Sequence, residues 1–335
     1  MTITIKDVAE KANVSIATVS RILNNKPGYT KETESKVLKV IEELGYHPNG
    51  LARGLINKRT HTIGVLVPKI SSMLISGFLT GIEAAAHKYG SSVIVCHTEL
   101  HGPKTTQYLN VLKEKQVDGI IYTSDLLTEE HYQILKDMGK PLVLLSSESH
   151  EFPVPYVKVN DRLAAYSATE YLIKKGHRKI GMISGLKEDS LAGQPRIDGF
   201  MQAMRAHQLP IKNEWIVPIG FKFEEGMKGF RQLVKQFPDI TAVFAASDEL
   251  ALGILSAAYQ MDIKIPDQLS VIGYDNLEIA EMSIPPLTTV AQPSEKMGKK
   301  AAELVFQMMV KKQPVESRIF PHEIIERNSV RTRGK

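Results

Sequence analysis

From Thr62 onward, short apolar runs alternate with runs of helical periodicity, and this alternation restricts the fold more than any other feature of the chain. The apolar runs are rich in Val, Ile and Leu, which predicts buried strands, and runs such as 78–90 and 129–139 predict helices between them. Such alternation indicates parallel sheets with helices on both faces. The strand-like runs are 62–68, 92–97, 119–124, 141–147, 156–159, 179–185, 215–220, 242–247 and 270–275.

The alternating pattern occurs twice, which predicts two similar α/β lobes rather than one sheet. We expect the chain to cross between the lobes near Asn160-Asp161, around Gln292 and near Phe320. A helical run at 295–312 would then return to the first lobe, and 318–329 would form a final strand. Ligands of doubly wound parallel sheets bind beyond the carboxyl ends of the strands.

The first 45 residues carry a different pattern, in which three short helices are each too small to bury a core alone. Thr4 and Asp7 have the spacing of a capping box, Ser15 is a good N-cap for a second helix, and Thr30 and Gly45 delimit a third. One shared core is therefore expected. Its members would be Val8, Ala9, Ala12, Val19, Ile22, Leu23, Val37, Val40, Ile41 and Leu44.

The outer face of the second helix is left free by this packing, which is typical of a helix-turn-helix. Ile16 and Ala17 suit contact with thymine methyl groups, and Arg21 suits a pair of hydrogen bonds to guanine. Ser15 and the first amides of the helix suit a phosphate. The DNA-facing set would be Ser15, Ile16, Ala17, Ser20, Arg21 and Asn24. A plain helical hairpin with a solvated arginine is the alternative.

The distribution of charge supports a nucleic-acid-binding N-terminus. Residues 1–60 hold ten Lys or Arg against six Asp or Glu, a net charge of +4, whereas the whole chain has a formal charge of +5. Most of the excess positive charge therefore lies in less than a fifth of the chain. A basic module on a neutral body is the expected footprint of DNA binding.

The segments "TIKDVAEKANVSIATVSRILN" and "GYHPNGLARGL" closely resemble the LacI/GalR family of bacterial transcription regulators. The resemblance continues in family order through "GHRKIGMISG", "RIDGF", "SDELALGIL", "SVIGYDN" and "PLTTVAQP". It implies an α/β fold with three parts. These are a helix-turn-helix headpiece at 1–48, a hinge helix and linker at 49–60, and a core at 61–335 that resembles periplasmic binding proteins. The core would comprise lobe 1 (61–161 plus 292–320) and lobe 2 (162–291 plus 321–335).

The hinge segment follows Pro48 and has room for about two helical turns, a length that is marginal in water. The resemblance implies that two such helices, one from each subunit, lie in the minor groove at the operator centre. Leu55 would then be the wedge between central base pairs, with Asn49 and Ala52 beside it. From the residues alone, a flexible basic linker is equally consistent.

Polar residues follow the predicted strands at the points where a ligand would bind. Ser146 and Asp275 lie at the ends of strand-like runs, Asp248 directly follows one, and Arg196 is expected to start a helix after a loop. Fixed acceptors and donors of this kind suit a polyhydroxylated ligand. Asp248 is equally explained as an acid in the first turn of a helix, Asp275 as the cap of a turn, and Phe221 as a core residue.

The family resemblance assigns Arg196, Phe221, Asp275 and Gln292 to positions that line an effector cleft, and adds Ser72 and Leu74 from the first lobe. The sequence departs from some members of the family at this site. Ser146 stands where certain sugar and purine responders carry an acid, and Leu74-Ile75 where aromatic residues are common. The effector is therefore expected to be a sugar or sugar derivative other than the ligands of the lactose and purine repressors.

Other classes of protein are disfavoured by what the sequence lacks. It contains no G-x-G-x-x-G, G-x-x-x-x-G-K-[ST], G-x-S-x-G or H-E-x-x-H motif, so no catalytic residue, cofactor or metal site is assigned. His177 precedes a strand and is expected to be structural. The single cysteine, and the lack of a signal peptide or membrane span, fit a cytoplasmic protein.

These observations predict a repressor of a carbohydrate-utilisation or related metabolic operon. It would bind a palindromic operator as a homodimer and respond to a small-molecule effector. The chain has no heptad-repeat tail after the last strand, which disfavours a tetramer of that kind. The alternative is a regulator of the catabolite-control type, activated by a phosphorylated carrier protein. Lys296, Lys299 and Lys300 would supply positive charge for that partner.

Overall fold

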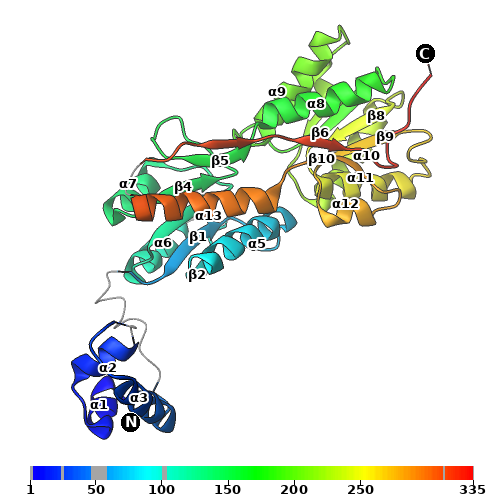
Figure 1. Cartoon of the computed structure of the whole chain (residues 1–335). Coiled ribbons are helices and arrows are strands. Elements are labelled where there is room, and N and C mark those ends of the chain that lie inside the picture. The colour runs from blue at the N-terminus through cyan, green and yellow to red at the C-terminus, as the bar shows by residue number, and fades with distance from the viewer. Residues whose placement is uncertain (1–2, 24–25, 47–58, 100–103, 312–313, 335) are drawn as a thin grey trace. The chain divides into compact units, whose positions relative to one another are not determined.

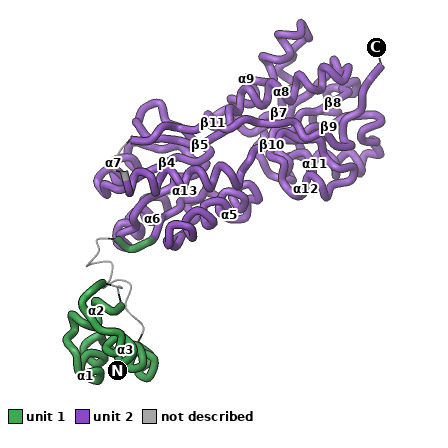
Figure 2. The backbone as a smooth tube through the Cα atoms, viewed as in Figure 1, with its two compact units in different colours: residues 1–61 green, residues 62–335 purple. Residues whose placement is uncertain are grey.

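The computed structural model describes residues 3–23, 26–46, 59–99, 104–311 and 314–334, and the chain divides into two compact units, residues 1–61 and 62–335 (Figure 2). Asn24 and the predicted hinge residues Asn49, Ala52 and Leu55 lie outside the described residues. The two units are therefore taken one at a time.

The N-terminal unit holds α1 (Ile5–Ala12), α2 (Ile16–Leu23) and α3 (Lys31–Leu44) around one small core. The sequence-predicted caps are confirmed. The Asp7 carboxylate accepts from the amide and the hydroxyl of Thr4, at 2.7 Å each. The Thr18 amide donates to Ser15 Oγ over 3.1 Å, and the Thr33 amide donates to Thr30 Oγ1 over 3.2 Å. Local hydrogen bonds thus fix where each helix begins.

Lobe 1 is built on a parallel sheet in the order β11-β5-β4-β3-β1-β2. Helices cover both faces (Figure 1): α5 and α13 share one apolar core with the sheet, and α6 and α7 share the other. The strands are β1 (Thr62–Val67), β2 (Ser92–His97), β3 (Gly119–Thr123), β4 (Leu142–Leu145), β5 (Tyr156–Val159) and β11 (Arg318–Phe320). The helices are α5 (Met73–Lys88), α6 (Lys104–Glu114), α7 (Glu129–Met138) and α13 (Ser294–Lys311).

Lobe 2 repeats the arrangement with a sheet in the order β12-β10-β9-β8-β6-β7, in which β12 alone runs antiparallel. Helix α8 packs on α9, and α10 packs on α11 (Figure 1). The strands are β6 (Ile180–Ser184), β7 (Ile216–Pro218), β8 (Ala242–Ala245), β9 (Ser270–Asp275), β10 (Thr288–Ala291) and β12 (Glu323–Ile325). The helices are α8 (Asp161–Lys174), α9 (Gly193–Ala206), the 3₁₀ turn η1 (Asn213–Trp215), α10 (Phe223–Gln236), α11 (Asp248–Gln260) and α12 (Glu278–Met282).

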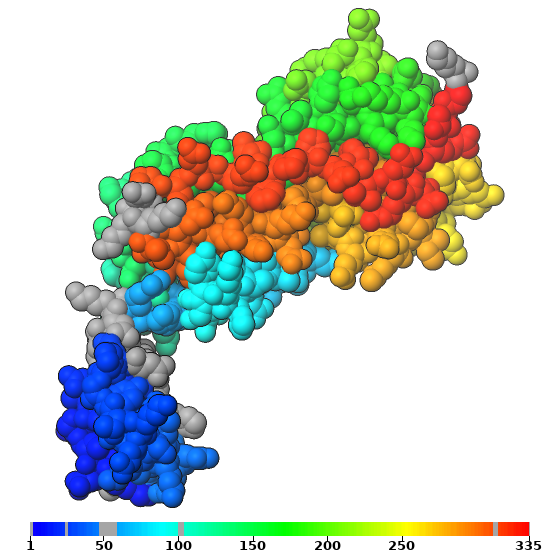
Figure 3. All heavy atoms as spheres, in the orientation of Figure 1, coloured from blue at the N-terminus to red at the C-terminus, as the bar shows by residue number. Residues whose placement is uncertain are grey.

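Three details differ from the sequence prediction. The expected final strand at 318–329 is two strands, because β11 pairs with β5 in lobe 1 and β12 pairs with β10 in lobe 2. Pro321, which has no amide hydrogen to donate, lies between them, and the segment passes along the face of both lobes (Figure 3). Strand β10 was not predicted as a strand, and α9 begins at Gly193, three residues before Arg196.

The chain passes between the lobes three times, at short segments. It leaves lobe 1 between Val159 and Asp161, returns between Ala291 and Ser294, and leaves again between Phe320 and Glu323. Since α8 packs on α9, Asp161 belongs to lobe 2. These passages bring the carboxyl ends of the parallel strands of both sheets to the region where the lobes meet.

Candidate DNA-binding and effector sites

Helix α2 has one buried and one exposed face, as a recognition helix requires. Val19 and Ile22 are buried in the headpiece core. On the other side Ser15, Ala17 and Arg21 are exposed, Ile16 is 43% exposed, and Ser20 is half-buried. An apolar side chain as exposed as Ile16, beside a cation, is available for contact with base edges.

The turn after α2 is shaped around Arg21. Gly28 has a φ of +117°, a backbone conformation that L side chains rarely adopt, and a Cβ there would lie 3.4 Å from Arg21 Nη1. Gly28 was not singled out from the sequence. The signal available for it was the Pro-Gly pair at 27–28, which marks a turn without revealing what packs against it.

At the carboxyl ends of the strands in the body, several backbones adopt left-handed conformations. Ser124 follows β3 and Ser146 follows β4, both with φ of 52°, while Asp275 ends β9 with φ of 116° and Asn276 has φ of 55°. Non-glycine residues in such conformations cost about 1–3 kcal/mol each and cluster at functional sites. The strained ends of three strands therefore mark the same edge of the sheets that sequence reasoning selected.

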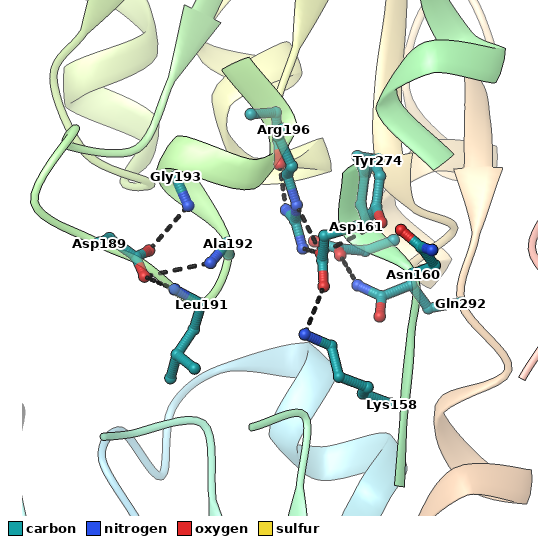
Figure 4. A network of polar contacts seen from close by, with 12 residues as sticks. Lys158, Asn160, Asp161, Asp189, Leu191, Ala192, Gly193, Arg196, Tyr274 and Gln292 are labelled. Carbon is teal, nitrogen blue, oxygen red and sulfur yellow. Dashed lines mark hydrogen bonds and ion pairs between the residues drawn. The ribbon is translucent and has the colours of Figure 1, made fainter. Parts of the chain in front are cut away.

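Arg196 lies at the centre of a buried polar network in lobe 2 (Figure 4). Its Nε and Nη2 donate to Asp161 Oδ1 over 3.0 and 2.9 Å, and Nη1 donates to the carbonyl of Ala246. The guanidinium stacks on Tyr274, 3.7 Å from the ring centroid, and lies 5.7 Å from that of Phe221. Burial acts to lower the pKa of Arg196, but the charges around it hold the pKa above its usual value, so the guanidinium is charged.

Asp161 is the member of this network that sequence reasoning missed as a site residue. From the sequence, Asp161 marks only a crossing between the lobes. Its Oδ1 also accepts from the hydroxyl of Tyr274 over 3.2 Å, and its Oδ2 lies 3.8 Å from Lys158 Nζ. The sequence signal was an acid two residues after the strand run "YVKV", but its partner Arg196 is 35 residues away.

Asp275 and Gln292 connect the end of β9 to the passage after β10. Gln292 Nε2 donates to Asp275 Oδ1 over 2.6 Å, and both side chains are buried. Burial raises the pKa of the Asp275 carboxyl, while the charge of Arg196 and the hydrogen bond from Gln292 act in the opposite direction. Arg196, Phe221, Asp275 and Gln292 are thus neighbours in the structure.

Asp248 has a different environment. Its Oδ1 accepts from the Thr289 hydroxyl over 2.6 Å, its Oδ2 accepts from the Leu277 amide over 2.8 Å, and the residue is fully buried. Burial and the charge of Asp275 raise the pKa of this carboxyl. Both oxygens are occupied by the protein, so Asp248 ties α11 to β10 and to the start of α12.

The predicted site residues of lobe 1 lie at the start of α5 and at the end of β4. Ser72 directly precedes α5, Leu74 is half-buried in its first turn, and Ser146 follows β4. The two lobes meet here through an ion pair, since Lys69, in the loop after β1, lies 3.5 Å from Glu249 of α11. Groups from both lobes therefore face one region.

Phe221 owes its position in lobe 2 to Gly185. A Cβ on Gly185 would lie 2.3 Å from the Phe221 ring, so only glycine accepts the ring there. The half-buried ring leaves part of its surface exposed beside Arg196. It is therefore shared between the core and the site, which is why the sequence alone left both interpretations open.

His177 is structural, as the sequence predicted. Nε2 faces the carbonyl of Arg331 at 3.2 Å, so it carries the hydrogen of the neutral ring, and Nδ1 lies 3.0 Å from the Thr241 hydroxyl. Burial lowers its pKa to about 4.

Within the described ranges, no group of three His, Cys, Asp or Glu residues is arranged to hold a metal ion. None of the helices in those ranges is long and apolar enough to cross a membrane.

Comparison with known proteins agrees with this geometry. Residues 4–49 match the family model "Bacterial regulatory proteins, lacI family", and residues 169–330 match "Periplasmic binding protein-like domain". The chain is 37% identical over 333 residues to catabolite control protein A of Priestia megaterium, covering 99% of this chain and 100% of that protein.

Two solved structures are similar along nearly the whole chain. A lac repressor dimer bound to operator and the anti-inducer ONPF has a TM-score of 0.89 at 25% identity, covering 99% of this chain and 100% of that one. A complex of the regulator CelR with cellobiose has a TM-score of 0.75 at 28% identity, covering 98% and 99%. The relatives are transcriptional regulators rather than enzymes.

Proposed function

We propose that this DNA-binding transcriptional regulator, which belongs to the LacI family of bacterial regulatory proteins, represses a carbohydrate-utilisation or related metabolic operon. It binds a palindromic operator as a homodimer, and a neutral, sugar-like effector held where the two lobes meet controls its affinity. The observation that carries the proposal is the convergence of strained strand ends from both lobes with the buried polar network around Arg196 and Asp275.

The proposed DNA-reading surface is the exposed face of α2. Ile16, Ala17 and Arg21 contact base edges, while Ser15 and Ser20 lie beside them. Asn24 belongs to the same proposal through its place on the predicted outer face of the second helix, and the hinge residues Asn49, Ala52 and Leu55 belong to it through the family resemblance. A dimer places two such helices on two half-sites, so the operator is expected to be palindromic.

Charge pairing within the body favours a neutral effector over an anionic one. Arg196 is paired with Asp161, Lys158 with Glu148, and Lys69 with Glu249. An anionic ligand would have to displace one of these carboxylates, whereas hydroxyl groups can share the existing donors and acceptors. The proposed effector contacts are Ser72, Leu74, Ser146, Arg196, Phe221, Asp275 and Gln292. Asp248 supports them from behind, in place of the direct contact that the sequence suggested.

The mechanism is a linkage between the lobes and the headpieces. The dimer exchanges between one lobe arrangement that favours operator binding and one that does not, and the effector binds the two with different affinities. Couplings of this kind are typically about 1–3 kcal/mol, or roughly 5- to 150-fold in affinity. A ligand whose contacts come from both lobes is suited to this role because its affinity depends on how the lobes are placed.

The DNA-binding part is tested by comparing Arg21→Met with Lys39→Met. Both variants remove one exposed positive charge from the headpiece, but only Arg21 lies on the outer face of α2, whereas Lys39 lies on α3. On an operator selected from random duplexes, Arg21→Met should lose roughly 1–3 kcal/mol of specific binding, and Lys39→Met much less. Equal losses in the two variants would contradict the assignment of α2.

The effector is sought by thermal shift with glucose, ribose, cellobiose, their phosphates and free nucleobases, because a ligand of the native state raises the melting temperature. Stabilisation by neutral sugars alone is the expected result. Stabilisation by the phosphates alone would overturn the argument from charge pairing. Any hit is then repeated with Gln292→Leu, which removes the amide that bonds Asp275 and should abolish the shift.

A phosphorylated carrier protein is the second candidate controller, favoured by the exposed Lys296 and Lys299 near the start of α13. No thermal shift with any sugar, together with capture of a phosphoprotein by the wild type but not by Lys296→Met/Lys299→Met, would replace the small-molecule effector with this partner.

A further inference from the structure

Lobe movements in this chain have to be absorbed at the three passages between the sheets. The first is the shortest, since β5 ends at Val159 and α8 begins at Asp161, with Asn160 between them. Asn160 is itself fixed as the N-cap of α8, because its Oδ1 accepts from the Leu163 amide over 3.0 Å. Rotations between domains are absorbed by a few residues of this kind at the ends of elements.

Lys158 is an unusual residue for the lobe 1 side of this passage. It lies on β5 between Val157 and Val159, and its side chain is only 8% exposed. Removing an ammonium group from water is costly unless the charge is paired with good geometry. Its Nζ lies 2.7 Å from Glu148 Oε1, in the segment after β4 of the same lobe, and 3.8 Å from Asp161 Oδ2 on the other side of the passage.

Asp161 is held firmly by lobe 2. Its Oδ1 accepts from two nitrogens of Arg196 and from the hydroxyl of Tyr274, so the carboxylate cannot turn without breaking three hydrogen bonds. Its Oδ2 points toward Lys158 (Figure 4). The four charges Glu148, Lys158, Asp161 and Arg196 alternate in sign and run from lobe 1 across the first passage into lobe 2.

We propose that Lys158 is a positioning residue that sets the resting arrangement of the two lobes by dividing its charge between Glu148 of lobe 1 and Asp161 of lobe 2. The separation of 3.8 Å between Nζ and Oδ2 is about 1 Å longer than a charge-assisted hydrogen bond. Rotation about the passage therefore shortens or lengthens this ion pair, while the Asp161–Arg196 pair, which lies within lobe 2, stays unchanged.

Among the charged groups at the lobe junction, Lys158 is the one whose ion pairs depend most on the arrangement of the two lobes. Glu148 has a side chain that is 26% exposed, so water can replace its ion pair at low cost. The second ion pair between the lobes, Lys69–Glu249, has side chains that are 43% and 23% exposed. Such an exposed pair contributes little and is weakened by salt. Lys158, buried beside the passage, is screened much less.

This inference rests on the proposed function only for its consequence, namely that the resting lobe arrangement decides the unliganded operator affinity. The lobe arrangement is measured without DNA or effector, on the full chain, by the distance between two spin labels. Labels at exposed Lys113 on α6 and Lys235 on α10, in a background with Cys96→Ser, report lobe 1 and lobe 2. A failure here leaves the operator and sugar tests standing, and those tests can fail without changing this distance.

Lys158→Met should shift the mean label distance or broaden its distribution, and Lys158→Arg should restore it. Glu148→Gln should shift the mean label distance in the opposite direction, because Lys158 then forms an ion pair with Asp161 alone. Lys174→Met, which removes an exposed lysine paired with Glu170 on α8, is the matched control and should leave the distance unchanged.

A lysine with a purely structural role gives a different result. Lys158→Met would then lower the melting temperature with the label distance unaltered, which overturns the proposal. Shifts in the same direction for Lys158→Met and Glu148→Gln also overturn it. If Lys158→Met does not fold, Glu148→Gln decides alone, since it keeps the buried lysine and one partner: an unchanged distance refutes the role of Lys158.

Discussion

Replacing Arg196 with methionine tests whether the polar network at the lobe junction stabilises the fold, in addition to its proposed role in binding the effector. Methionine keeps much of the packing volume but leaves Asp161, which is 7% exposed, without the donors at 3.0 and 2.9 Å. Removing one partner of a buried ion pair typically costs about 3–5 kcal/mol. The carbonyl of Ala246 and the face of Tyr274 lose their contacts too, so we expect a loss near the upper end of that range.

The free energy of unfolding is measured by urea titration, followed by the fluorescence of Trp215. This is the only tryptophan of the chain, and it is buried in the core of lobe 2. Arg205→Met, at an exposed position of the same helix, is the control and should change stability by less than about 0.5 kcal/mol.

Removal of both partners measures how strongly the stabilising effects of Arg196 and Asp161 depend on each other. In Arg196→Met/Asp161→Asn neither partner of this ion pair is charged, so the double variant should be about 2 kcal/mol more stable than the sum of the single losses predicts. Additivity within about 0.5 kcal/mol would refute the view that Asp161 depends on Arg196 for its burial.

Two further predictions concern the buried His177 and the predicted hinge helix. The pKa of His177 is lowered to about 4 by burial, against about 6.5 in the unfolded chain, so the unfolded chain binds the proton first as the pH falls. The free energy of unfolding should therefore fall by about 2 kcal/mol between pH 7 and pH 5 because of this residue. In urea titrations, His177→Gln should not show this part of the fall. Wild type and variant profiles that run parallel over this pH range would contradict the prediction. Leu55→Ala should weaken specific operator binding far more than non-specific binding in competition titrations, and equal losses would remove the wedge assignment.

The headpiece and most strands of the body were accessible from the sequence because their signals are local. The capping pairs Thr4–Asp7 and Thr30–Thr33 are three residues apart, and the strands are continuous apolar runs bounded by polar residues. The parallel pairing follows from the helices between the strands. Predictions of this kind need no knowledge of what packs against each element.

The sequence was least informative where the outcome depends on distant residues. Asp248 follows β8 as a ligand-binding acid would, but its carboxylate is taken by Thr289, 41 residues away. Asp161 was not selected because its partner Arg196 is distant in sequence, and the last strand was not divided because β11 and β12 pair with different sheets. Tertiary partners decided each case, and a single sequence does not reveal them.

The measurement that tests the central claim most directly is the affinity of the full-length protein for its selected operator, with and without the sugar that raises its melting temperature. Fluorescence anisotropy titration at fixed salt should show a change of roughly 5- to 150-fold, and Gln292→Leu should abolish it. A sugar that stabilises the protein but leaves operator affinity unchanged would contradict the proposed linkage between the lobe junction and DNA binding.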